Sequence, residues 1–134
     1  MWLECGVFST QGVDGNNRLG TGFVGEGRAA CEIAMAGLSV DEAREQGIEC
    51  VSQRLPMKAS GRATTINQTD GFVELLADSD TGILLGATIV GPHASELIAE
   101  ICVAIEMAAA VEDVALTIHP HPTLSELVMD TAQT

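Results

Sequence analysis

From residue 31 onward, hydrophobic and polar positions follow one another in short runs that predict strands. Such runs are rich in β-branched and other apolar residues and are bounded by glycine, proline or polar residues, as half-buried strands usually are. Four of them cover 31–37, 48–55, 72–77 and 83–90. The last two are joined by the polar connection 78–82, which ends in glycine, so we expect a hairpin there.

Helical patterns alternate with these strands. Ser39 and Glu42 have the spacing of a capping box, which predicts a short helix over 40–46 that Gly47 ends. The segment 58–63 reads as a polar turn into a short helical piece.

A longer helix is predicted to start near His93 or Ala94, after Gly91-Pro92 ends the last strand. Its apolar positions recur every three or four residues, as one buried face requires. They are Leu97, Ile98, Ile101, Cys102, Ile105 and Ala108. Glu96 and Glu100 mark the opposite face of this helix.

Two further helices are predicted, one over 111–118 and a last one that decays at 130–134. The order of the elements is strand, helix, strand, hairpin and then helices. It predicts an α+β fold in which an antiparallel sheet carries helices on one face. We assign this domain to residues 31–134.

Residues 1–30 form a separate glycine-rich segment with seven of the 14 glycines and no sustained period of 2 or 3.6. Loops and one short strand are expected there. Gly20, Gly22 and Gly25 fit the G-x-G-x-x-G fingerprint of dinucleotide sites, but no buried strand precedes them. That fingerprint works only between a buried strand and a helix. We therefore predict no nucleotide binding here.

Composition narrows the classes of function. The net charge of −13, with six Lys and Arg against 19 acidic residues, argues against nucleic-acid binding, which needs cations to neutralise phosphates. The acidity fits an ordinary acidic surface best, with adaptation to high salt or a basic partner as alternatives. No apolar run approaches the 18 or so residues of a membrane span, and the first residues lack the pattern of a signal peptide. We expect a cytoplasmic protein of one domain.

The four cysteines, Cys5, Cys31, Cys50 and Cys102, are scattered without a C-x-x-C pair or the spacing of a zinc site. We expect free thiols and no metal. His93 and Glu96 alone offer too few ligands to change that expectation.

The candidate chemistry lies in the stretch from His119 to Glu126. Pro122 suits the first turn of a helix and disfavours helix in the residue before it, so His121 is expected just ahead of a helix. Thr123 and Glu126 have the spacing of a capping box, which would lean the Glu126 carboxylate toward His121. An imidazole paired with a carboxylate suits proton transfer near neutral pH. An ordinary capped helix with two exposed histidines is the competing interpretation.

Three segments together resemble a known family. His121-Pro-Thr-Leu-Ser-Glu126, preceded by the segments 91–100 and 104–108, resembles the C-terminal dimerisation (interface) domain of the dihydrolipoamide dehydrogenases, which are pyridine nucleotide-disulfide oxidoreductases. The resemblance spans about residues 31–130. It implies the same α+β domain that the hydrophobic pattern predicts.

The resemblance also implies a role for each site residue. By it, His121 is the acid/base that takes a proton from a dithiol substrate, Glu126 orients His121, and His119 matches a second histidine of the family. Pro120 stands where alanine is usual, and Ile118 where cysteine is usual. These departures concern the backbone of the loop and leave the spacing of His121 and Glu126 unchanged.

In the family, the domain forms most of a homodimer interface and presents its histidine to the flavin and disulfide of the partner subunit. This chain has no cysteine pair four residues apart. We therefore expect a dimerisation domain that binds neither FAD nor NAD and is inactive alone, although full-length relatives use both cofactors.

Two other functions stay open. The chain could be a free-standing interaction module that pairs with full-length flavoenzyme subunits or another partner. It could also be an unrelated His/Glu hydrolase, but Ser125 lies inside the motif rather than on a strained elbow, so a nucleophile is missing. We expect a homodimer and no binding to nucleic acid or membrane.

Overall fold

The four strands predicted from the sequence form one antiparallel sheet. The computed structural model describes residues Phe8–Ser9, Gly22–Phe23 and 32–134. The sheet has the order β3-β6-β5-β4, and β5 and β6 are joined by the predicted hairpin connection. Its strands are β3 (Glu32–Gly37), β4 (Cys50–Pro56), β5 (Phe72–Asp78) and β6 (Leu84–Gly91). Two short strands, β1 (Phe8–Ser9) and β2 (Gly22–Phe23), pair with each other.

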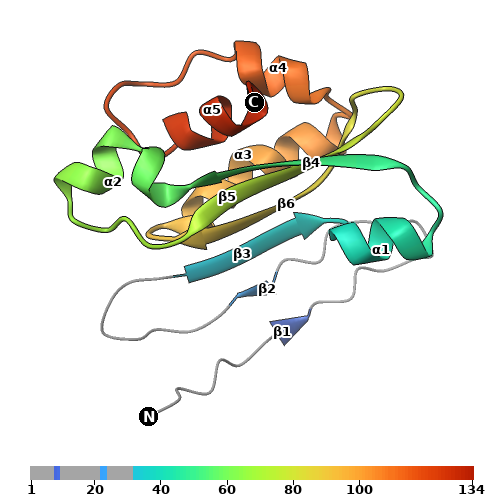
Figure 1. Ribbon diagram of the computed structural model, residues 1–134, viewed down its shortest axis with the longest axis horizontal. Helices are drawn as coiled ribbons and strands as arrows, with labels where there is room; N and C mark the ends of the chain where they lie inside the picture. The colour runs from blue at the N-terminus through green and yellow to red at the C-terminus, as the bar shows by residue number, and fades with distance from the viewer. Residues whose placement is uncertain (1–7, 10–21, 24–31) are drawn as a thin grey trace.

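The longer helices lie on one face of this sheet (Figure 1). α3 packs against β3 and β6, α5 packs against β4 and β5, and α4 packs on α5. The helical elements are α1 (Val40–Glu45), the 3-10 turn η1 (Met57–Ala59), α2 (Gly61–Thr65), α3 (Ala94–Glu106), α4 (Val111–Leu116) and α5 (Glu126–Ala132). The predicted α+β fold is confirmed.

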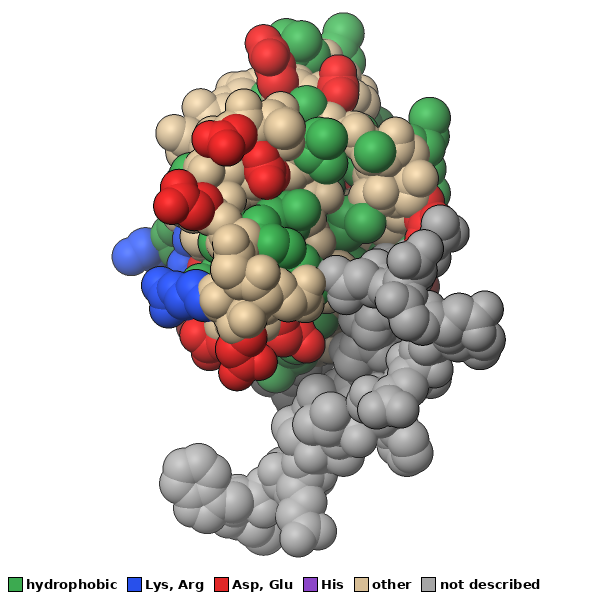
Figure 2. Space-filling model, turned by 90° about the vertical axis from the view of Figure 1, so that its right-hand side faces the viewer, with side chains coloured by type: hydrophobic (Ala, Val, Ile, Leu, Met, Phe, Trp, Pro, Cys, Tyr) green, Lys and Arg blue, Asp and Glu red, His purple; other side chains and the backbone are tan. Residues whose placement is uncertain are grey.

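Acidic side chains dominate the charged part of the surface. Figure 2 shows Asp and Glu spread over the described part of one face, with hydrophobic side chains exposed among them and cations gathered at one edge. Among the described cations, Arg54, Lys58 and Arg62 are close together in the chain. The longest described helix, α3, has 13 residues, and none of the described helices is long and apolar enough to cross a membrane.

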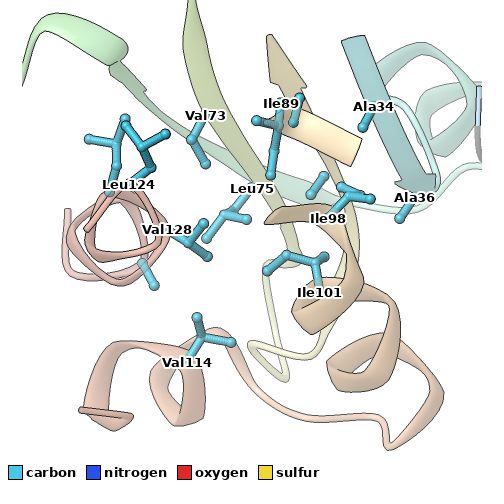
Figure 3. Packing of buried hydrophobic residues seen from close by; sticks show 14 of the residues in the cluster. Ala34, Ala36, Val73, Leu75, Ile89, Ile98, Ile101, Val114, Leu124 and Val128 are labelled. Carbon is cyan, nitrogen blue, oxygen red and sulfur yellow. The ribbon is translucent and has the colours of Figure 1, made fainter. Parts of the chain in front are cut away.

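The main core lies between the sheet and the helices α3, α4 and α5 (Figure 3). Ile98 and Ile101 come from α3, and Leu127 and Val128 come from α5. They meet sheet residues such as Leu75, and the side chains at these positions are almost completely buried. Burial of each such side chain contributes about 1.5–3 kcal/mol, so this layer is the main source of stability.

The short helix α1 covers part of the other face. Leu75 and Leu76 are consecutive strand residues, so their side chains point to opposite faces. Leu76 packs with Ala43 of α1 and with Leu38 in a second, smaller cluster. The prediction of helices on one face therefore describes α3 and α5 but not α1. Gly86 allows the backbone of β6 to lie close to Leu38, since a Cβ at residue 86 would lie 2.0 Å from the backbone oxygen of Leu38.

Two predicted helix ends were wrong. Ala108 lies beyond the end of α3 with a positive φ of 51°, and the N–H of Ala109 donates to the carbonyl of Ala104. This bond and the one from Ala108 to Ile105 form a Schellman motif, which ends the helix although alanine replaces the usual glycine. α4 ends at Leu116, two residues earlier than predicted.

The last helix ends within the predicted range 130–134. α5 continues to Ala132, because Thr131 and Ala132 are buried and the Thr131 hydroxyl donates to the carbonyl of Leu127. Tertiary burial thus stabilises the polar end of this helix.

Some predictions fall outside the described residues. Of the Gly20–Gly25 fingerprint only Gly22 and Phe23 are described, and Cys5 and Cys31 lie outside as well. Cys50 and Cys102 are free thiols.

Candidate functional site

The candidate site lies on the connection between α4 and α5. We call residues 117–125 the motif segment. Most of its residues are exposed and a few are turned inward: the Ile118 residue is 93% exposed, whereas the His119 side chain is 6% exposed. The His121 side chain is again 81% exposed, and Leu124 is buried in the main core. The two histidines, two residues apart, therefore have opposite environments.

His121 and Glu126 make the contact that the sequence predicts. Nδ1 of His121 lies 2.7 Å from Oε1 of Glu126, at the first residue of α5. The other carboxylate oxygen, Oε2, accepts the backbone N–H of Thr123 at 2.7 Å. One carboxylate thus fixes both the ring and the backbone turn beside it. The His121–Pro122 peptide bond in this turn is cis.

Only half of the predicted capping box is formed. The Thr123 hydroxyl donates to the carbonyl of Pro120 at 2.6 Å instead of capping the helix. α5 consequently begins at Glu126, so the prediction that Pro122 stands in the first turn of the helix was wrong. The motif segment remains a non-helical turn that is held by its own side chains.

The geometry selects one tautomer of His121. A carboxylate accepts hydrogen bonds, so the ring nitrogen facing Glu126 carries the proton, and Nε2 of the neutral ring keeps its lone pair. Because the ring is largely exposed, Nε2 is open to a molecule outside this chain. The arrangement can accept a proton at Nε2 and stabilise the resulting cation through the carboxylate.

Hydrogen bonds keep Glu126 ionised. The N–H of Thr123 and the ring of His121 hold the pKa of the Glu126 carboxyl below its ordinary value, and nearby His121 and His119 add to this lowering. The carboxylate is therefore available as an acceptor across the neutral range.

His119 pairs with a second glutamate, on a different helix. Nε2 lies 2.8 Å from Oε2 of Glu100 on α3, and Nδ1 lies 2.9 Å from the carbonyl oxygen of Thr117. Burial alone would lower the pKa of His119, but the bonds to Glu100 and Thr117 raise it, and the pKa lies above its ordinary value. The sequence did not predict this pair, because its members are far apart in the chain and no motif joins them.

Beside this pair a groove of about 500 Å³ runs between α3, α4 and the motif segment. Val103, Met107, Thr117 and His119 line it together with small residues of α3 and its end. Large hydrophobic side chains are exposed on the same elements, namely Val103, Met107, Leu116 and Ile118. We call these four residues the apolar rim. Sequence periodicity could not find the rim, because three of its members lie beyond helix ends or on the outer face of α3.

The remaining candidate metal ligands do not lie close to one another in the described residues. His93 caps α3 in a left-handed conformation and lines a different groove, with Arg62 and Leu97. Within the described ranges no group of three or more His, Cys, Asp or Glu side chains could hold a metal ion.

Fold and site together define a class of protein. A four-stranded antiparallel sheet under helices, with an exposed apolar rim and a His–Glu pair on a C-terminal turn, describes an interface domain. The chain belongs to the family of pyridine nucleotide-disulphide oxidoreductase dimerisation domains, whose model matches residues 29–132.

Dihydrolipoyl dehydrogenases are similar in sequence to this chain. The chain is 57% identical over 102 residues to dihydrolipoyl dehydrogenase of Halobacterium salinarum, which covers 76% of this chain and 22% of the relative. It is 55% identical to the enzyme of the same name from Haloferax volcanii, with the same coverage. The chain thus spans about a fifth of the length of these relatives.

Solved structures show the same domain within longer chains. LpdA from Mycobacterium tuberculosis matches with a TM-score of 0.78 and 28% identity, covering 88% of this chain and 25% of that protein. The flavoprotein disulfide reductase RclA from Escherichia coli matches with a TM-score of 0.73 and 25% identity, over 76% and 23% of the two chains.

Proposed function

We propose that this chain forms a homodimer through the apolar rim and the groove beside it. The observation that supports this is the exposure of large side chains that do not belong on a free surface: Met107 is 75% exposed and Leu116 is 74% exposed. Exposed apolar residues that gather on adjoining elements mark interaction sites. A second copy that covers the rim would remove this area from water, at about 25 cal/mol for each Å² of apolar surface.

His121 and Glu126 form the acid/base pair in this proposal. Nε2 of His121 takes a proton from one thiol of a dithiol substrate, and the thiolate attacks a disulfide carried by a full-length partner subunit, since this chain has no such cysteine pair. A mixed disulfide forms, and the second thiol then displaces the partner's sulfur. The substrate becomes a disulfide, and the partner's disulfide becomes a dithiol. The substrate class is a small dithiol such as dihydrolipoamide, as the names of the relatives suggest.

FAD and NAD belong to other domains in this proposal. The described residues between β6 and α3 read Gly91-Pro-His-Ala94, which lacks the glycine spacing of a pyrophosphate-binding turn. We derive no step through either cofactor, and we expect the chain alone to bind neither and to catalyse no turnover. We also place the protein in the cytoplasm.

Light scattering after size-exclusion chromatography tests the dimer. We expect twice the chain mass of 14.0 kDa for the wild type. Ile118→Asp or Met107→Asp should yield monomers, since each would bury a charge in the interface. Val51→Asp is the matched control, because Val51 is an exposed hydrophobic residue on β4, outside the rim. A wild-type monomer, or dimers in all variants, would contradict the proposed interface.

The same surface could receive a full-length flavoenzyme subunit, because this chain is 57% identical to one relative across the domain. Mixing the chain with such an enzyme, followed by activity and mass measurements, tests whether the two exchange subunits. Subunit exchange with loss of activity supports an interaction module, whereas unchanged activity and mass support the homodimer alone.

A further inference from the structure

Both ring nitrogens of His119 face groups that only accept hydrogen bonds. Nδ1 meets the carbonyl oxygen of Thr117 at 2.9 Å, and Nε2 meets the carboxylate of Glu100 at 2.8 Å. Neither a carbonyl nor an ionised carboxylate can donate a hydrogen bond. A neutral imidazole has only one N–H, so it would leave one nitrogen lone pair against an acceptor. The geometry therefore requires the imidazolium, with both nitrogens donating.

This cation joins the motif segment to α3, which is anchored in the main core. Glu100 lies on α3, whose Ile98 and Ile101 are buried in the main core. The far end of the motif segment is anchored by Leu124, which is also buried in that core. His121 stands between the two anchors, and its neighbours Pro120 and Pro122 are exposed. The position of the exposed His121 ring thus depends on the contacts at both ends of the motif segment.

We propose that His119 is a positioning residue: its imidazolium, clamped between the Thr117 carbonyl and Glu100, holds the motif segment against α3 and thereby fixes where His121 is presented. The consequence for catalysis rests on the proposed function of His121. The existence of the clamp is inferred only from the contacts of His119 and does not depend on the proposed function of His121.

The charges around His119 favour its cationic form. Glu100 on α3 is its direct partner, and Glu126 on α5 acts on it from a greater distance. Asp113 on α4 lines the same groove and adds a third negative charge. His121, two residues along the segment, would oppose the cation only when it is itself protonated. The hydrogen bonds to Glu100 and Thr117 and the charges of Glu100 and Glu126 thus outweigh burial and raise the pKa of His119, which favours the cation.

The raised pKa of His119 determines how the stability of the fold depends on pH. A histidine whose pKa is raised by folding contributes stability that is complete below its ordinary pKa of about 6.5. That stability is lost as the pH rises through the higher value in the folded chain. Above this range the ring loses one N–H, one of the two bonds breaks, and the clamp on the motif segment weakens.

Imidazole ¹⁵N NMR of the full 134-residue chain tests this. We expect both ring nitrogens of His119 to carry protons at pH 7, and the amide signals of Ile118 and His121 to shift with the same midpoint as His119. Glu100→Gln should lower that midpoint by about one pH unit, a tenfold loss of proton affinity. Glu96→Gln, one turn earlier on α3 and exposed, is the matched control and should leave the midpoint unchanged.

Amide hydrogen exchange gives an independent readout. His119→Gln cannot be a cation, so we expect exchange at Thr117 and Thr123, whose N–H groups donate to Val114 and Glu126, to accelerate about tenfold while exchange in β5 and β6 stays the same. An ordinary midpoint for His119, an equal response to both glutamine variants, or unchanged exchange at 117 and 123 would overturn the proposal. These measurements do not depend on dimerisation, so a monomer in light scattering would remove the proposed interface and leave the clamp standing.

Discussion

At the residue scale, two histidines in one segment have different chemistry because tertiary contacts give them different partners. His121 is exposed and has one carboxylate at Nδ1, which leaves Nε2 open as a base. The His119 side chain is nearly buried and both of its ring nitrogens are paired within the chain, so neither is open to a substrate. Each histidine is followed by a proline, and the spacing to Glu126 singled out His121 in the sequence. Only the fold shows the partners of His119.

Glu126 should control acid stability. Folding lowers the pKa of its carboxyl, so its contribution to stability is complete above the ordinary glutamate pKa of about 4.3 and is lost as the pH falls through the lower folded value. Glu126→Gln should therefore unfold at lower urea concentration than wild type at pH 7, and this difference should shrink below pH 4. Urea unfolding at several pH values measures it.

Glu45→Gln serves as the control for that experiment, since Glu45 is exposed at the end of α1. It should follow the wild type at every pH. A gap between wild type and Glu126→Gln that stays constant from pH 7 to pH 3 would contradict the ionic role of the carboxylate.

At the element scale, local signals identified the strands and the starts of α1, α3 and α4, whereas the start of α5 and the end of α3 needed the structure. The capping box of α1 is fully formed: the Ser39 hydroxyl accepts the N–H of Glu42, and the Glu42 carboxylate accepts the N–H of Ser39. α4 starts differently, because Ala110 occupies its N-cap and has no side-chain oxygen. There only the reverse bond is present, from the N–H of Ala110 to Asp113.

These two helices allow a paired test of capping. Ser39→Ala should lower the free energy of unfolding by about 0.5–2 kcal/mol, and Ala110→Ser should raise it by a similar or smaller amount. Both positions have extended backbone geometry at the cap, so the serine hydroxyl at 110 can reach the N–H of Asp113. Chemical denaturation measures both changes.

Ser39→Thr is the rescue variant in this series, because threonine also caps helices. It should restore most of the stability that Ser39→Ala loses. Equal stability of Ser39→Ala and wild type would show that α1 is held by Ala43 and its apolar neighbours instead of its cap.

At the scale of the whole molecule, the proposed interface brings together apolar surface on two strongly acidic chains. Each copy carries a formal charge of −13, and Figure 2 shows acidic side chains around exposed hydrophobic ones on one face. Repulsion between the copies opposes association, and salt screens it over a Debye length that falls from about 30 Å at 0.01 M to about 3 Å at 1 M. Burial of the apolar rim is not weakened by salt.

The dimer should therefore tighten as salt rises. Between 0.05 M and 1 M NaCl we expect the dissociation constant from sedimentation equilibrium to fall by about tenfold. Val51→Asp, with one more negative charge per chain, should show at least as large a fall. Weaker association at high salt would point to an interface held by ion pairs in place of the apolar rim.

The sequence by itself determined the strands, the hairpin, the capped start of α1, and the contact between His121 and Glu126. Those features depend on residues within about five positions of one another, where alternation, capping and turn chemistry act directly. The short motif that contains His121 and Glu126 also indicated the family, because its residues are contiguous in the chain.

Only the tertiary structure decided how α5 ends, which side chains form the apolar rim, and what His119 does. Thr131 is helical because it is buried, and Ile118 is exposed because α4 stops short of it. The partner of His119 is a glutamate 19 residues earlier on a different helix, which α3 brings close only after it packs against the sheet. No local sequence signal predicts a contact between residues so far apart in the chain, because the packing of the core determines it.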